Sequence, residues 1–251
     1  MRYFKILHFL SLDVVVGAVA LNDVFYQHFM GSLPPWQFDL ILAISVFLIY
    51  GIDRQIDNYT SEARDELHAF HEKHQVVLRR MYIALGIYLG MLLMWVEFPM
   101  VKFGLGLGVV ILLYWFGWVK HIFRRFWGFK ELLTASIYSL GVMLPTMVIA
   151  PYSALLVGCV TEVFLLALLN LCLFTLIEEG GNVRIWMACC LAAFLGLIGL
   201  GVIGLPIGLL SLLFFMWGFH VGIYYFRVSK PERYVGDLAF LSPLIYLLCQ
   251  Y

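Results

Sequence analysis

The sequence predicts an all-α, polytopic membrane protein with about nine transmembrane helices. Of its 251 residues, 63% are hydrophobic, 17% are aromatic and 13% are charged, whereas a soluble domain averages about 45–50% apolar and about 25% charged residues. The mean hydropathy is +0.93. Apolar runs that can cross about 30 Å of hydrocarbon recur along the whole chain. These observations exclude a soluble globular enzyme, a disordered chain, a disulfide-stapled secreted domain and a nucleic-acid-binding protein.

The predicted spans are the apolar runs between charge clusters and Pro or Gly breaks. A crossing needs roughly 20 apolar residues, so the long runs that contain Pro99, Pro151 and Pro206 are each divided into two. The first run is interpreted as a retained helix, because polar residues interrupt it and no small-residue cleavage site follows. The whole chain, 1–251, is assigned to one transmembrane domain. The predicted spans are 6–28, 36–52, 77–97, 101–119, 131–150, 152–176, 185–203, 205–226 and 235–250.

Basic residues mark one face of the predicted membrane domain. Of the 16 lysines and arginines, all but Lys102 lie at the N-terminus, in the segments 53–76, 120–130, 177–184 and 227–234, or at Arg79 and Arg80 just after the first of these segments. With nine spans these segments share one side, and the positive-inside rule assigns that side to the cytoplasm. The sequence therefore predicts a multi-pass protein of a cell inner membrane, with its N-terminus in the cytoplasm and its C-terminus outside.

Two acidic residues stand four positions apart at the cytoplasmic end of the second span. Asp53 and Asp57 share one face of a helix at this spacing. Two neighbouring carboxylates repel each other mildly. Their proximity becomes favourable when a hard cation lies between them and binds both. Mg²⁺ is typically held by one or two carboxylates together with substrate phosphate oxygens. The alternative is a solvated helix end, in which Arg54 only anchors the helix at the cytoplasmic face.

A second pair of oxygen-bearing residues ends the sixth span at the same level. Glu178 and Asn182 repeat the four-residue spacing, and a diphosphate with bridging Mg²⁺ fits between two such pairs. The alternative is an ordinary polar loop. Cationic groups that bind phosphate follow on the same side at Lys120, Arg124 and Lys130, although the positive-inside rule alone also predicts such a cluster.

This arrangement resembles the UbiA superfamily of intramembrane prenyltransferases, which have nine helices and Asp-rich cytoplasmic motifs after the second and sixth spans. The segment Asp53-Arg54-Gln55-Ile56-Asp57 resembles the second half of the first family motif, and Glu178-Glu179-Gly180-Gly181-Asn182 matches the spacing of the second. The stretch from Lys130 to Gly141, which includes Tyr138, resembles the start of the family's fifth helix. The likeness in layout covers nearly the whole chain, while the motif identity is confined to about a dozen residues.

The chain departs from the family motifs at defined positions. Ile49 and Tyr50 stand where the family has Asn and Asp, and Asn182 replaces an acidic residue. The number of charged metal ligands is therefore reduced, which indicates a degenerate or specialised branch of the family.

The resemblance implies an Mg²⁺-dependent enzyme that moves a prenyl group from a prenyl diphosphate to a lipophilic acceptor at the cytoplasmic face of the bilayer. Asp53 and Asp57 are then the catalytic residues and metal ligands, with Glu178 and Asn182 as further metal ligands opposite them. The expected substrate-binding residues are Arg54, Lys120, Arg124, Lys130, Tyr138, Asn170 and Glu162.

Two of these residues lie inside the predicted sixth span, where polar groups are costly and face a cavity or a partner. Glu162 is interpreted either as an acceptor-binding or proton-removing group, or as a paired carboxyl between helices. Asn170 either lines the cavity or forms an interhelical hydrogen bond.

Two other functions remain open on the sequence. The first is a non-catalytic UbiA-like protein that binds an isoprenoid or quinone and serves in assembly, which the missing Asn-Asp pair favours. The second is a small-solute transporter that uses Asp13 and Glu162 near the bilayer midplane. Inverted repeats would support a transporter, and no convincing internal repeat is found.

Overall fold

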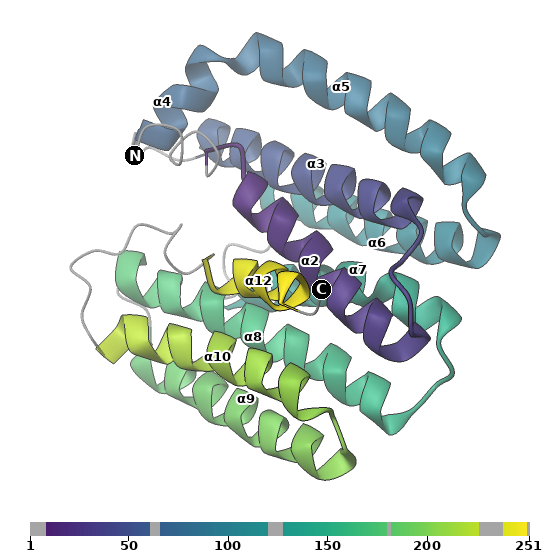
Figure 1. Cartoon of the computed structure of the whole chain (residues 1–251). Coiled ribbons are helices and arrows are strands. Elements are labelled where there is room, and N and C mark those ends of the chain that lie inside the picture. Colours follow the sequence, from purple (N-terminus) through teal and green to yellow (C-terminus); the bar gives the residue numbers. More distant parts are fainter. Residues whose placement is uncertain (1–8, 61–65, 120–127, 180–181, 226–237, 250–251) are drawn as a thin grey trace.

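The structure is a computed structural model that describes residues 9–60, 66–119, 128–179, 182–225 and 238–249. Every regular element in these ranges is a helix (Figure 1). The elements are α2 (Leu12–Met30), α3 (Trp36–Thr60), α4 (Glu66–Lys73), α5 (Gln75–Leu92), η1 (Leu93–Trp95), α6 (Phe98–Val119), α7 (Phe129–Ile149), α8 (Ala154–Glu179), α9 (Val183–Ile203), α10 (Ile207–Tyr225), η3 (Leu238–Leu241) and α12 (Ser242–Leu248).

Local sequence signals explain where several helices begin and end. Gly31 follows α2 with a φ of 74°, and Gly204 follows α9 with a φ of 102°; both conformations favour glycine at a helix C-terminus. Asn182 precedes α9, and its Oδ1 accepts a hydrogen bond from the Arg184 backbone N–H at 2.9 Å. This is the N-cap geometry for which Asn is among the preferred residues.

Seven helices within the described residues are long and apolar enough to span a membrane: Trp36–Ile56, Gln75–Trp95, Phe98–Gly117, Phe129–Ile149, Ala154–Ile177, Val183–Ile203 and Ile207–Tyr225. They match seven of the predicted spans, and the chain turns near Pro99, Pro151 and Pro206 as the sequence predicts. The protein is therefore an all-helical, multi-pass integral membrane protein.

The count of about nine spans is not confirmed, because two predicted spans differ from these seven. The span predicted at 6–28 appears as α2, which is long enough to cross but is made less apolar by Asn22, Asp23 and other polar residues. The span predicted at 235–250 appears as the short helices η3 and α12. The seven residues of α12 rise only about 10 Å, which is too short for a crossing.

The helices form two groups on either side of a central pair (Figure 1). The central pair is α2 and α7, which pack against each other. Helices α3, α5 and α6 lie on one side and α8, α9 and α10 on the other, while α12 packs on α2. Fully buried side chains line the centre, among them Phe25 of α2 and Leu169 of α8.

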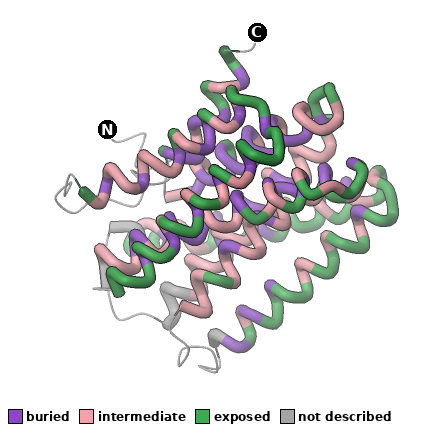
Figure 2. Tube along the Cα trace, turned by 90° about the horizontal axis from the view of Figure 1, so that it is seen from below, coloured by how far each residue is buried: buried purple, intermediate pink, exposed green. Residues whose placement is uncertain are grey.

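The outer helices present apolar side chains to their surroundings. Figure 2 shows buried residues concentrated in the middle of the molecule and exposed residues along its outer helices. Ile87 of α5, Leu113 of α6 and Leu195 of α9 are each more than half exposed. Such a surface suits lipid chains rather than water. Successive spans run in opposite directions, so the end of α3, the start of α7 and the end of α8 lie at one end of the bundle.

Candidate functional site

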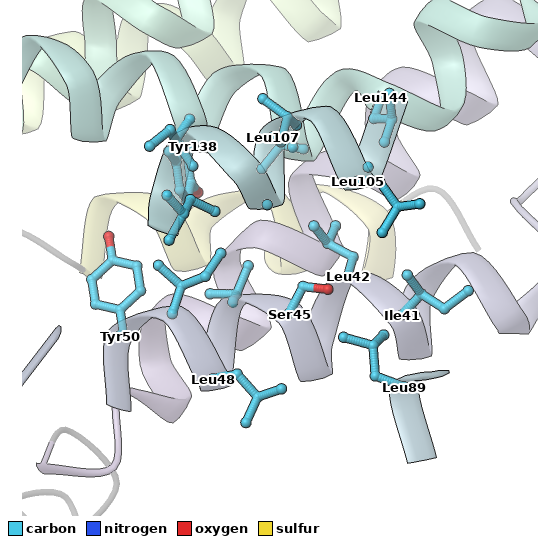
Figure 3. Close-up of a pocket in the computed structure, with 18 of the residues that line it drawn as sticks. Ile41, Leu42, Ser45, Leu48, Tyr50, Leu89, Leu105, Leu107, Tyr138 and Leu144 are labelled. Carbon is cyan, nitrogen blue, oxygen red and sulfur yellow. The ribbon is translucent and has the colours of Figure 1, made fainter. Parts of the chain in front are cut away.

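A cavity of about 500 Å³ lies among α3, α5, η1, α6 and α7. Its wall is almost entirely apolar, with Leu42 and Leu48 from α3, Leu89 from α5, and Leu105 and Leu107 from α6 (Figure 3). Ligand pockets of about 300–1,000 Å³ with mostly apolar walls and a few polar groups are typical of small-molecule sites. This cavity has the size and lining expected for an apolar ligand.

The cavity is long and runs along α3. Phe38 near the start of α3 and Asp53 near its end both line it, and their separation of 15 residues corresponds to about 22 Å at 1.5 Å per residue. Tyrosines line the wall toward the Asp53 end, namely Tyr50 of α3, Tyr114 of α6 and Tyr138 of α7. The cavity therefore has a polar end and a long apolar body.

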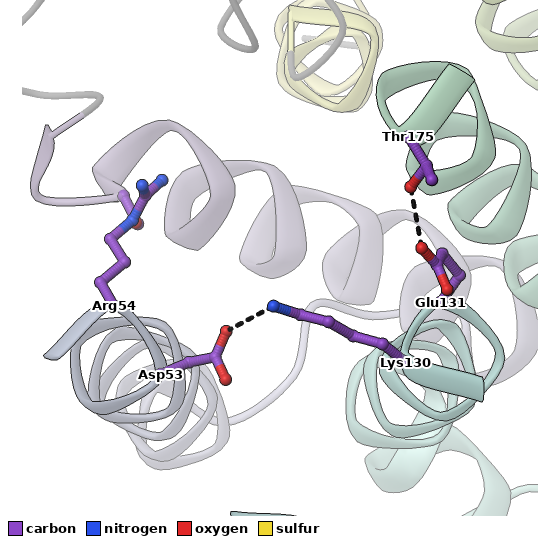
Figure 4. A network of polar contacts seen from close by, with 6 residues as sticks. Asp53, Arg54, Lys130, Glu131 and Thr175 are labelled. Atoms are coloured by element: carbon purple, nitrogen blue, oxygen red, sulfur yellow. Dashed lines mark hydrogen bonds and ion pairs between the residues drawn. The ribbon is translucent and has the colours of Figure 1, made fainter. Parts of the chain in front are cut away.

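An ion pair marks the polar end. The Lys130 Nζ of α7 lies 4.0 Å from the Asp53 Oδ2 of α3 (Figure 4), and the two side chains are 34% and 27% exposed. Ion pairs with this exposure contribute little to stability. The pair instead places one negative and one positive group where the cavity meets the end of the bundle. Sequence analysis predicted both residues for the site, and the structure brings them together.

The first turn of α7 connects the two helices that carry the predicted motifs. Lys130 faces Asp53 on α3, whereas the next residue, Glu131, accepts a hydrogen bond from the Thr175 Oγ1 of α8 at 2.8 Å (Figure 4). Glu131 also stands in the first turn of its helix, where a negative charge is favourable. Sequence reasoning did not single out Glu131 or Thr175. Proximity in the sequence could have indicated them, because Glu131 directly follows Lys130 and Thr175 lies three residues before Glu178.

Arg54 points away from Asp53, although the two are neighbours in the sequence (Figure 4). Its Nε donates a hydrogen bond to the Ser11 Oγ at 3.1 Å. Close by, the Nε2 of His71 on α4 lies 2.9 Å from the Phe9 carbonyl oxygen. The structure therefore uses Arg54 to hold the segment before α2 against the end of α3, and it does not place Arg54 at the cavity.

Four predicted site residues cannot be placed at side-chain level. Asp57 lies in the last turn of α3 and Glu178 near the end of α8, one turn beyond Thr175, but their side chains lie outside the described part of the structure. Lys120 and Arg124 lie in 120–127, which is also outside it. The predicted pairing of the two acidic motifs across a shared cation thus stays a prediction.

Asn182 serves the helix that follows it. Its exposed side chain caps α9 through the hydrogen bond to Arg184. The same oxygen that the sequence suggested as a metal ligand therefore already accepts a backbone N–H group, which weakens the case for Asn182 in a cation site.

Tyr138 and Asn170 line a second, small cavity of about 30 Å³ between α2, α3, α7, α8 and η3. Tyr138 lines the large cavity as well. The Asn170 Oδ1 lies 3.1 Å from the Nε2 of His220 on α10, and the His220 Nδ1 donates to the Met216 carbonyl oxygen at 2.7 Å. Asn170 is therefore an interhelical partner of His220, and it lines the small cavity but not the large one.

Glu162 lies outside both cavities and faces α9. Its side chain is 1% exposed, and neither carboxylate oxygen has a hydrogen-bond partner among the described residues. A Cβ atom at Gly196 of α9 would collide with the Glu162 Oε2, so the glycine makes room for the carboxyl. This position favours the interpretation of Glu162 as a carboxyl packed between helices.

Mg²⁺ is the cofactor that the family resemblance implies. Within the described residues, no three His, Cys, Asp or Glu side chains lie close enough to form a metal-binding group. Asp53 nevertheless offers a carboxylate, 27% exposed, at the polar end of the cavity. Since Mg²⁺ is commonly bound by one or two carboxylates plus substrate phosphates, Asp53 fits a metal that arrives with a diphosphate, and does not form a complete site alone.

No protein-family model, curated protein or solved structure matches this chain. The functional argument therefore depends on the geometry of the site.

Proposed function

We propose that this protein is a UbiA-type, nine-helix intramembrane prenyltransferase. Its prenyl diphosphate would place the isoprenoid chain in the cavity along α3 and the diphosphate at Asp53 and Lys130. The observation that carries the proposal is a long apolar cavity inside a membrane-type helix bundle, ended by one carboxylate and one ammonium group. This arrangement matches an amphiphile with an apolar chain and an anionic head.

Binding would exchange the partners of the ion pair. Lys130 Nζ, now 4.0 Å from Asp53, can donate charge-assisted hydrogen bonds to phosphate oxygens. Asp53, with Asp57 one turn further on the same helix, would hold Mg²⁺ against the diphosphate. When bound, the ion would neutralise the negative charge that builds up on the departing diphosphate.

The prenyl transfer would then take place where the diphosphate of the ligand joins its isoprenoid chain. The bond between the allylic carbon and the bridging oxygen breaks, and its electron pair leaves with the diphosphate. The acceptor forms a bond to the allylic carbon and loses a proton. The apolar wall excludes water from the allylic cation, and the rings of Tyr50, Tyr114 and Tyr138 are near enough to the polar end to offer aromatic faces to it.

A second candidate is a non-catalytic isoprenoid-binding protein. The observation that favours it is that Asp53 is the one acidic residue lining the cavity in the described part of the chain, where it already pairs with Lys130. A small-solute transporter is less well supported. The polar groups of the cavity lie mainly at one end, and Glu162 does not line it.

A turnover assay tests the proposal. The purified full chain in nanodiscs is incubated with labelled geranylgeranyl diphosphate, Mg²⁺ and a panel of quinone, aromatic and lipid acceptors. We expect a prenylated product that is lost in Asp53→Asn and retained in Glu97→Gln, which removes an exposed carboxylate at the opposite end of the bundle. Binding without turnover would support the second candidate. Absence of both turnover and Mg²⁺-dependent diphosphate binding would contradict both.

A further inference from the structure

Three of the five cysteines gather where α8 and α9 pack against each other. Cys172 lies on α8, and Cys189 and Cys190 lie on α9. A hydrogen bond joins the side chains of Cys172 and Cys189, and Cys190 is close to both. All three are free thiols. Two thiols in contact on different helices need only a small side-chain movement to form a disulfide, whose S–S bond is about 2.0 Å long.

The thiols that would form this bond are Cys172 and Cys189. Consecutive residues of a helix do not face each other, so a bond between Cys189 and Cys190 would require α9 to distort. Cys172 and Cys189 instead meet across the interface between two helices. Cys190 is then a neighbouring third thiol, which can reopen the disulfide by exchange.

The thiol pair lies inside the membrane-spanning part of both helices. Cys172 is seven residues from the end of α8, and Cys189 is six residues from the start of α9, which places them about 10 Å from these helix ends. Beside Cys190, the apolar side chains of Met187 and Leu191 are more than half exposed and belong to a candidate membrane span. Charged reagents such as glutathione are costly to bring to this depth, whereas a lipid-soluble molecule reaches it from the hydrocarbon.

We infer that Cys172 and Cys189 form a redox-active dithiol whose oxidant is a lipid-soluble quinone. Two S–H bonds break and one S–S bond forms, so the pair loses two electrons and two protons. The quinone accepts both electrons and takes one proton on each carbonyl oxygen, and it leaves as the hydroquinone. A quinone fits this position because it dissolves in the bilayer and accepts electrons and protons together. The inference does not rest on the proposed function, and either can fail without the other.

The test oxidises the reduced full chain in nanodiscs with duroquinone. This quinone dissolves in lipid, and its ring carries a methyl group at every position, so a thiol finds no free position to which it can add. Hydroquinone is measured by its absorbance, free thiols by maleimide labelling of the unfolded chain, and the bonded cysteines by mass spectrometry of peptides. We expect the loss of two thiols and the gain of one hydroquinone per chain, with a peptide pair joined through Cys172 and Cys189.

Single substitutions assign the reaction to this pair. Cys172→Ser and Cys189→Ser each remove one partner and should abolish both hydroquinone formation and the joined peptides. The matched control is Cys159→Ser, which removes a buried thiol beside Glu162 on the same helix α8 and should react as the wild type does. The unfolding temperature of each variant is measured. If a serine variant does not fold, Cys172→Ala takes its place, and the peptide map of the wild-type chain still identifies the bonded cysteines.

Each other outcome overturns a defined part of the inference. A disulfide between Cys189 and Cys190, or hydroquinone formation that survives in folded Cys172→Ser, overturns the assignment of the pair. Oxidation by diamide or hydrogen peroxide without oxidation by duroquinone overturns the quinone as oxidant. Equally fast oxidation by a charged quinone sulfonate overturns access from the lipid phase. Thiols that resist every oxidant in the folded chain would show that these cysteines serve only to pack α8 against α9.

Discussion

Asp53 and Lys130 combine two properties at the scale of single residues: they are charged, and they end an apolar cavity. About a third or less of each side chain is exposed, with the ammonium 4.0 Å from the carboxylate. An ion pair of this exposure adds little to folding stability, so changing either residue should alter ligand binding more than the unfolding temperature. The neighbouring Glu131 has a more structural role through its hydrogen bond to Thr175.

The first prediction concerns the ammonium group. Lys130→Gln removes a charge-assisted hydrogen bond to the diphosphate, which is worth about 1.5–3 kcal/mol, so prenyl diphosphate affinity should fall by tenfold or more. A binding titration in nanodiscs measures this change. Lys102→Gln, which removes an exposed lysine at the other end of the bundle, should leave the affinity unchanged. Equal affinities for the wild-type and Lys130→Gln proteins would show that the head group lies elsewhere.

Helix α6 carries the clearest test at the scale of an element. Gly108 lines the cavity, and a Cβ built there meets no atom within 4 Å, whereas Gly106 has the same open space but does not line the cavity. Gly108→Leu should therefore fill part of the cavity and weaken geranylgeranyl diphosphate binding. Gly106→Leu should place its side chain toward lipid and leave binding intact. Both affinities are measured by titration, and equal affinities would contradict the assignment of the tail to this cavity.

Helices α8 and α9 supply a second test, this time of packing. Gly196→Ala puts a methyl group against the Glu162 Oε2, and overpacking of this kind costs about 1–3 kcal/mol. Gly199→Ala, which meets nothing within 4 Å, should not destabilise. Adding Glu162→Ala to Gly196→Ala should recover part of the lost stability, because the collision partner is gone. Thermal unfolding in detergent compares the variants, and a fully stable Gly196→Ala would refute this packing.

At the scale of the whole molecule, the sequence predicted what depends on local composition. Apolar runs and their Pro breaks located seven spans. The four-residue acidic spacing selected Asp53, and the resemblance of the segment that begins at Lys130 selected Lys130 and Tyr138; all three line or end the cavity. What could not be predicted depends on helix packing. Glu131 and Thr175 are 44 residues apart, and only the position of α7 between α3 and α8 brings them together. The hydrogen bond from Arg54 to Ser11 also depends on packing, because the two residues are 43 positions apart and the sequence does not show that they meet.

The number of crossings is the property of the whole molecule that most needs a measurement, and α2 decides it. Its 19 residues rise about 28 Å, and Figure 1 shows it running beside α3 across the bundle. Buried positions such as Ala18, Leu21 and Phe25 let protein contacts compensate for its polar residues, so we expect α2 to cross the membrane.

The exposed Ser32 in the turn after α2 should then face outside and the exposed Asn182 should face the cytoplasm. One cysteine is introduced at each position, in a chain whose exposed Cys249 is changed to Ser and whose other four cysteines are buried or half-buried. Intact cells are then treated with a membrane-impermeant thiol reagent. Ser32→Cys should react at once, and Asn182→Cys only after permeabilisation, as should a tag at the N-terminus. A tag that is accessible on intact cells would mean that α2 does not cross, and labelling of both cysteines from one side would contradict the alternating arrangement of the bundle.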